Sequence, residues 1–132
     1  GTQAVVAEFT MADSATIPTH LKTREVRTYM SVAAVNDLRA PDLSPPVAID
    51  EQSRSAQTFL VEAVVSSAGS TRRAVARGQD IYAITAPLVV EATRRVLATP
   101  NGPTGVFAAG ELFDARNFLR SLSPEHLTFE TR

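Results

Sequence analysis

The segment that decides the fold is residues 57–77, which read QTFLVEAVVSSAGSTRRAVAR. Apolar and other side chains alternate over 57–66 and again over 72–77, as they do along strands that bury one face. Between the two runs, Gly69 can adopt the positive φ that a tight reversal requires. The segment therefore predicts an antiparallel β-hairpin. Three arginines lie on its second strand, so at least one face of that strand is expected to meet solvent or an acidic partner.

Residues 86–98 predict a helix. Proline is tolerated in a first helical turn, where Pro87 stands, and Thr85 is placed to cap the free amides of that turn. An apolar stripe runs along the helix at helical spacing and comprises Leu88, Val89, Ala92, Val96 and Leu97.

The last part of the chain predicts three further elements. Residues 105–108 predict a short strand, and Asp114 is expected to cap a helix that runs through Leu122. Residues 126–130 alternate apolar and polar side chains and predict a final strand.

The part before the hairpin predicts shorter elements. Residues 4–9 and 25–32 favour strands, 11–15 a loop, 17–21 a single turn and 33–39 a loose helical turn. Residues 40–56 are rich in proline and polar side chains, which predicts a linker, a surface loop or a place where another segment has been cut out. Because strands come early and helices late, we expect one α+β domain over 1–132, with a mostly antiparallel or mixed sheet and helices on one face.

Composition narrows the possible functions. The formal net charge of −1 gives no basic field that would attract nucleic acid, and no apolar run is long enough to span a membrane. The chain contains no cysteine, which fits a cytoplasmic location and excludes thiolate metal sites. The two histidines, His20 and His126, lie far apart without a second ligand at metal-binding spacing, so we expect no metal site.

Known catalytic and nucleotide-binding motifs are missing from the sequence. The glycines form neither Gly-x-Gly-x-x-Gly nor a phosphate loop, and there is no Gly-x-Ser-x-Gly nucleophile motif. We therefore expect no cofactor to bind this chain by itself. The first residue is Gly1, which is what a domain excised from a longer protein would show.

Three segments, 74–82, 85–92 and 105–111, together resemble the end of the second domain of saccharopine dehydrogenase-like oxidoreductases; residues 9–32 resemble an earlier part of that domain more weakly. The resemblance implies a substrate-side and dimerisation domain that closes over a cofactor cleft. It also implies a parent enzyme in which a separate Rossmann domain binds NAD(P), with a homodimer as the assembly. No catalytic residue can be carried over.

Four polar residues in the matching segments are candidates for substrate binding: Arg77, Tyr82, Thr85 and Glu111. The free amides at the start of the helix after Thr85 could also hold a carboxylate or phosphate. The simpler interpretation is a capped strand-to-helix joint.

Two other functions stay open. One is a stand-alone module of the same fold that binds a small ligand or another protein. The other is a small enzyme that uses carboxylates such as Asp80 and Glu111, although no spacing in the sequence brings these two together.

Overall fold

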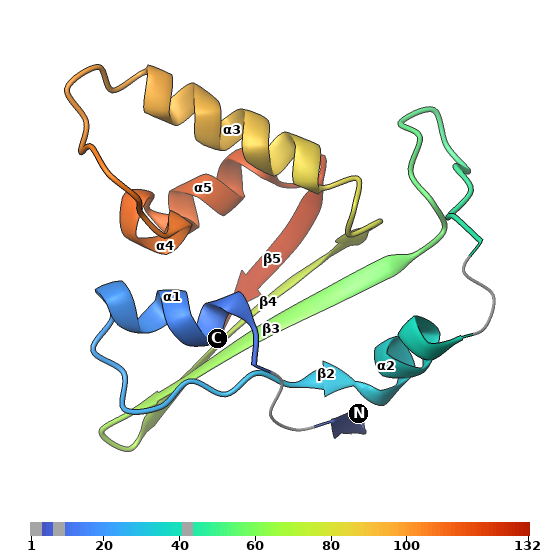
Figure 1. Cartoon of the computed structure of the whole chain (residues 1–132), viewed down its shortest axis with the longest axis horizontal. Coiled ribbons are helices and arrows are strands. Elements are labelled where there is room, and N and C mark those ends of the chain that lie inside the picture. The colour runs from blue at the N-terminus through green and yellow to red at the C-terminus, as the bar shows by residue number, and fades with distance from the viewer. Residues whose placement is uncertain (1–3, 7–9, 41–43) are drawn as a thin grey trace. The chain divides into compact units, whose positions relative to one another are not determined.

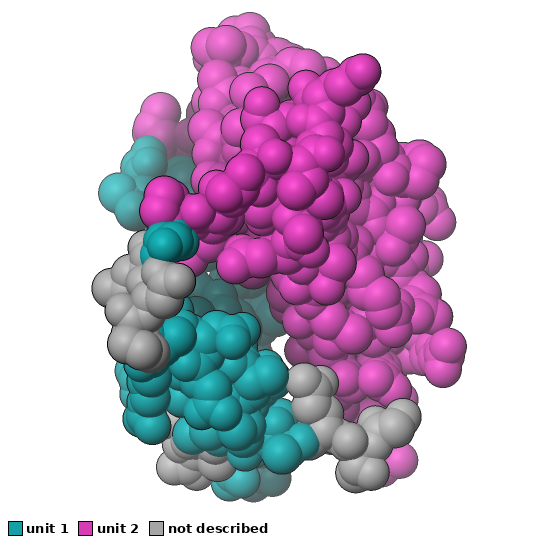
Figure 2. Space-filling model, turned by 90° about the vertical axis from the view of Figure 1, so that its right-hand side faces the viewer, with its two compact units in different colours: residues 1–44, 105–113 teal, residues 45–104, 114–132 magenta. Residues whose placement is uncertain are grey.

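The computed structural model describes residues 4–6, 10–40 and 44–132. The chain forms two compact units, coloured separately in Figure 2. Unit 1 comprises residues 1–44 and 105–113, and unit 2 comprises residues 45–104 and 114–132. Helices and antiparallel sheets occur together, which confirms the α+β class. No helix in the described ranges has both the length and the apolar character needed to cross a membrane.

Unit 1 is built from short elements. Strand β1 (Val5–Val6) pairs antiparallel with β2 (Met30–Ser31), and three helices accompany them: α1 (Ala12–His20), α2 (Val32–Arg39) and α4 (Ala109–Leu112). The predicted helical turn over 33–39 is confirmed as α2, whose first turn is capped by the Ser31 hydroxyl, which accepts from the Ala34 N–H at 3.2 Å.

Other expectations for unit 1 are corrected. Residues 11–15 belong mostly to α1 and are not a loop, since alanines favour a helix and Asp13 suits its first turn. Within the described part of the chain, Met30 and Ser31 are the residues of the predicted strand 25–32 that pair with another strand, and residues 105–108 pair with none. Residues 7–9 of the first predicted strand lie outside the described residues.

Unit 2 contains an antiparallel sheet in the order β3 (Thr58–Ser67), β4 (Ser70–Gln79) and β5 (Leu127–Thr131), with α3 (Thr85–Leu97) and α5 (Ala115–Leu122) beside it (Figure 1). The predicted hairpin is confirmed. Its two turn residues, Ala68 and Gly69, have φ values of 47° and 80°, the left-handed conformations that two-residue hairpin turns require. Asp114 also caps α5 as predicted, accepting from the Asn117 N–H at 2.7 Å.

The core of unit 2 lies between one face of this sheet and the two helices. Ile84, Leu122 and Leu127 are its buried members. Partly buried residues pack around them: Phe59, Leu88, Phe118, Leu119 and Phe129. The sheet residues of the cluster all point to the same face, since Phe59, Gly78 and Leu127 are directly opposite one another across the three strands. In unit 2 the helices therefore cover one face of the sheet, as expected.

Gly78 makes room for the Phe59 ring. A Cβ at this position would lie 2.6 Å from Cζ of Phe59 and 3.1 Å from the His126 carbonyl oxygen. We therefore expect Gly78→Ala to destabilise the protein by about 1–3 kcal/mol through overpacking, measured by urea denaturation followed by circular dichroism. If contact with the Phe59 ring is the cause, the double variant Gly78→Ala/Phe59→Leu will lose less stability than the sum of the losses in the two single variants. Strict additivity would contradict this packing.

Candidate functional site

The turn between β4 and α3 is organised by the Asp80 side chain. Asp80 is buried and has a φ of 55°, a left-handed conformation that Asp tolerates better than most residues. Its carboxylate accepts from the backbone N–H of Ser55 at 2.7 Å and from those of Tyr82 and Ala83 at 3.0 Å each. These hydrogen bonds, led by that from Ser55, lower the pKa of Asp80 to about 2. The ionised carboxylate of Asp80 therefore links the 45–57 loop to the end of β4 by hydrogen bonds.

The loop that Asp80 holds is closed by a second carboxylate. Asp50 accepts from the Arg54 N–H at 2.9 Å and from Arg54 Nε at 2.7 Å, and these contacts lower its pKa. Gln79 at the end of β4 donates to Ser55 O at 2.8 Å and to Asp50 Oδ2 at 3.3 Å. The later part of the predicted proline-rich segment is therefore an ordered surface loop, and the boundary between the two units falls within that segment.

The sheet face opposite the helices carries a small hollow of about 40 Å³. Val75 is buried at this hollow, whose other lining residues are Arg73, Arg77, Glu130 and Arg132. Glu130 accepts from Arg77 Nη1 at 2.7 Å and from Arg132 Nη2 at 3.0 Å, and these two guanidinium groups lower its pKa.

Guanidinium groups suit carboxylate or phosphate ligands because their donors form a planar fork. In this hollow, however, each arginine already has a carboxylate partner. Arg73 donates to Glu62 Oε2 at 2.9 Å, while Arg77 and Arg132 share Glu130. All three ion pairs are largely solvent-accessible. An anion that entered the hollow would therefore have to displace Glu62 or Glu130 from its arginine.

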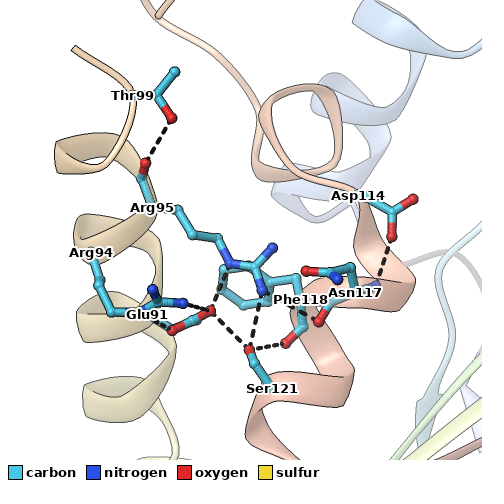
Figure 3. Close-up of polar contacts among 8 residues, drawn as sticks. All are labelled: Glu91, Arg94, Arg95, Thr99, Asp114, Asn117, Phe118 and Ser121. Carbon is cyan, nitrogen blue, oxygen red and sulfur yellow. Dashed lines mark hydrogen bonds and ion pairs between the residues drawn. The ribbon is translucent and has the colours of Figure 1, made fainter.

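A further polar cluster joins α3 to α5 (Figure 3). The carboxylate of Glu91 accepts from Arg94 Nη2 at 2.8 Å, from Arg95 Nε at 2.6 Å and from Ser121 Oγ at 2.9 Å. The hydrogen bonds from Arg94 and then Arg95 lower the pKa of Glu91 to about 2. The Arg95 guanidinium also lies 5.0 Å from the centre of the Phe118 ring, a cation–π contact. This cluster fixes the side of α3 that faces α5.

Of the four predicted substrate-binding residues, Arg77 lines the hollow on the sheet and the other three do not. Arg77 lies at the hollow on β4, whereas Tyr82 projects from the following turn with an exposed side chain. Thr85 begins α3, and Glu111 lies in α4 of unit 1. Their assignment to a substrate stays a prediction.

The expected capping by Thr85 is wrong. Its hydroxyl donates back to the Ile81 carbonyl at 3.4 Å, and its own N–H donates to Tyr82 O. The amides of Tyr82 and Ala83, just before the helix, already hold the carboxylate of Asp80. The carboxylate of Asp80 therefore occupies the amides of the turn before α3, whereas anion binding at the helix start after Thr85 stays a prediction.

Sequence reasoning missed the Glu91 cluster, although a signal was present. Arg94 and Arg95 follow Glu91 by three and four residues, the spacings that place side chains together on a helix.

Gly110 is explained by packing within unit 1, where a Cβ would lie 3.0 Å from Nε2 of His20.

Among the described residues, no three His, Cys, Asp or Glu side chains gather as the ligands of a metal ion would. No protein-family model, curated protein or solved structure matches this chain.

Proposed function

We propose that this chain is the substrate-side and dimerisation domain of a saccharopine dehydrogenase-like, NAD(P)-dependent oxidoreductase, inactive without a nucleotide-binding Rossmann domain. The observation that carries the proposal is the number of large apolar side chains that are exposed among the described residues, such as Val47, Leu60 and Val106, which a further domain or subunit would cover. The sequence resemblance of residues 74–82, 85–92 and 105–111 suggests the identity of the parent enzyme.

The exposed area is large for the chain length. The accessible surface is 10493 Å², whereas a compact folded monomer of this mass exposes about 6,700 Å². Two separate compact bodies of the sizes of the two units would together expose about 8,000 Å², so the division into units does not explain the difference. Even the buried apolar residues retain some accessibility, since no large side chain among the described residues falls below 2% exposure. Surface of this kind supports a role inside a larger assembly.

In the proposed enzyme, Arg77 is the residue best suited to recognise substrate. Its guanidinium lies at a hollow and could exchange Glu130 for a substrate carboxylate. Tyr82, whose side chain is exposed, and Thr85 lie on the segment that leads into α3 and do not line this hollow, so they are less suited than Arg77 to contact the same ligand. Hydride transfer would require the nicotinamide that the Rossmann domain holds.

A titration tests the cofactor part of the proposal. We expect no heat of binding when NADH or NADPH is titrated into the 132-residue chain, because the proposal places the nucleotide site on another domain. A polypeptide that joins the chain to its Rossmann domain is expected to bind one of the two. Micromolar binding by the chain alone would overturn the proposal that the nucleotide site lies on another domain.

The coding sequence around this segment separates the two leading functions. A strand followed by Gly-x-Gly-x-x-Gly in the same reading frame supports the oxidoreductase. A reading frame without such a motif favours the alternative, a stand-alone interaction module. The same exposed apolar surface also supports that alternative.

A further inference from the structure

The loop that follows α3, an orange trace in Figure 1, begins with a tight turn over Thr99, Pro100, Asn101 and Gly102. The Gly102 N–H donates to the Thr99 carbonyl at 2.9 Å, which closes the turn. Proline at the second position and glycine at the fourth are the residues that the commonest β-turn favours. The sequence after α3 therefore specifies a turn that carries an Asn-Gly pair.

The fourth position of this turn is suited to glycine. A Cβ on Gly102 would lie 3.0 Å from the Thr99 carbonyl oxygen and 3.3 Å from Cγ2 of the same residue. Because Gly102 has no side chain, its amide nitrogen is also open to the side chain of Asn101, which is exposed. The glycine that fits the turn thus leaves the preceding asparagine open to attack by the main chain.

We propose that Asn101 is a site of spontaneous deamidation. The Gly102 amide gives up its proton to hydroxide, and its nitrogen bonds to Cγ of Asn101. The Cγ–Nδ2 bond then breaks, and the leaving nitrogen takes a proton from water and departs as ammonia. Water opens the resulting five-membered succinimide at either of its two carbonyls, which gives aspartate or isoaspartate. No atom is oxidised or reduced in these steps.

The hydrogen bond of the Gly102 N–H must open before the nitrogen can attack. This bond lies at the surface: within residues 99–104, Gly102 is partly buried and the other five residues are exposed. Local opening of a segment with exposed backbone hydrogen bonds and few buried contacts costs little free energy. The turn therefore permits the reaction in the folded chain.

The other two asparagines of the chain provide internal controls. Asn36 lies within α2, and Asn117 lies in the first turn of α5. The Phe118 N–H, which would have to attack Asn117, donates to the Asp114 carbonyl at 2.9 Å inside that helix. A helix fixes the backbone angles that ring closure would have to change, and Asp37 and Phe118 carry side chains that hinder it. We therefore expect both asparagines to persist.

Deamidation would change a connection between the two units. The chain passes from unit 2 to unit 1 between Thr104 and Gly105, shortly after the turn. The reaction adds one carboxylate to a chain whose formal net charge is −1. Isoaspartate also lengthens the main chain by one atom, because the chain then runs through Cβ and Cγ of residue 101. The inference is independent of the proposed oxidoreductase role.

The test is an incubation of the full chain in mildly alkaline buffer, once folded and once in urea. Ion-exchange chromatography is expected to show an acidic species that accumulates in both samples. Mass spectrometry of peptides from the folded sample should place the mass gain of an amide-to-acid conversion at Asn101 and leave Asn36 and Asn117 unchanged. Asn101→Gln keeps a side-chain amide but would need a six-membered ring, so it is expected to lose the acidic species. Circular dichroism checks that this variant folds.

Three results would contradict the proposal. Reaction of Asn101 in urea without reaction in the folded chain would mean that the turn protects the pair. An acidic species that persists in Asn101→Gln would place the modification at another residue. Digestion with an aspartate-specific protease, which does not cleave at isoaspartate, should leave part of the product uncut; complete cleavage would show direct hydrolysis and overturn the attack by Gly102.

Discussion

Leu127→Ala is expected to remove a large share of the stability of unit 2. Leu127 is 5% exposed and belongs to a core with only two other buried members, Ile84 and Leu122. Truncating a buried leucine typically costs about 2–5 kcal/mol, against a total stability of about 5–15 kcal/mol for a whole domain. A core this small has few neighbours that could close the resulting cavity. Urea denaturation followed by circular dichroism should show a large fall in the transition midpoint.

Val61→Ala is the matched control for this substitution. Val61 lies on β3 in the same sheet, but 54% of it is exposed. We expect a change of about 0.5 kcal/mol or less, as for most surface substitutions. Both proteins must be compared at one concentration, because self-association adds to apparent stability. Equal losses in Leu127→Ala and Val61→Ala would contradict the location of the core.

The elements that the sequence predicted well are those specified by neighbouring residues. The hairpin depends on strand alternation and on Gly69, and the α5 cap depends on Asp114 and an amide three residues later. Strand pairing across a long separation is different. The alternation over 25–32 predicted a full strand, yet among the described residues pairing reaches only Met30 and Ser31, because alternation shows which side chains share a face and does not show which segment pairs with them.

The candidate site was predictable in its residue types but not in its contacts. Alternation placed Arg77 on the face of β4 opposite Ala76, but its partner Glu130 lies 53 residues further along the chain. Likewise, helical spacing identified the apolar stripe of α3 without showing which of its members are buried. Their burial depends on which side of α3 faces α5. The hydrogen bond from Ser121 of α5 to Glu91 helps to fix that side.

Acid is expected to destabilise this protein through Asp80 and Glu91. The pKa values of both groups are lowered to about 2, from ordinary values of 3.8 and 4.5. A carboxyl whose pKa is lower in the folded state binds fewer protons there than in the unfolded state. Its stabilising contribution is therefore complete above about pH 4.5 and is lost as the pH falls towards 2. Asp50 and Glu130, whose pKa values are also lowered, add to the same decline.

Substitutions assign that decline to individual residues. Asp80→Asn keeps a side chain that tolerates the left-handed conformation but removes the charge that three amides share. The free energy of unfolding at pH 7 should therefore fall. The further loss between pH 4.5 and pH 2 should be smaller than in the wild type. Glu91→Gln should behave in the same way, because a neutral amide cannot pair with Arg94 and Arg95 together. Glu125→Gln changes an exposed side chain on the same unit and serves as the control. If urea denaturation gives the same pH dependence for all three variants and the wild type, neither carboxylate has the clamping role that its hydrogen bonds indicate.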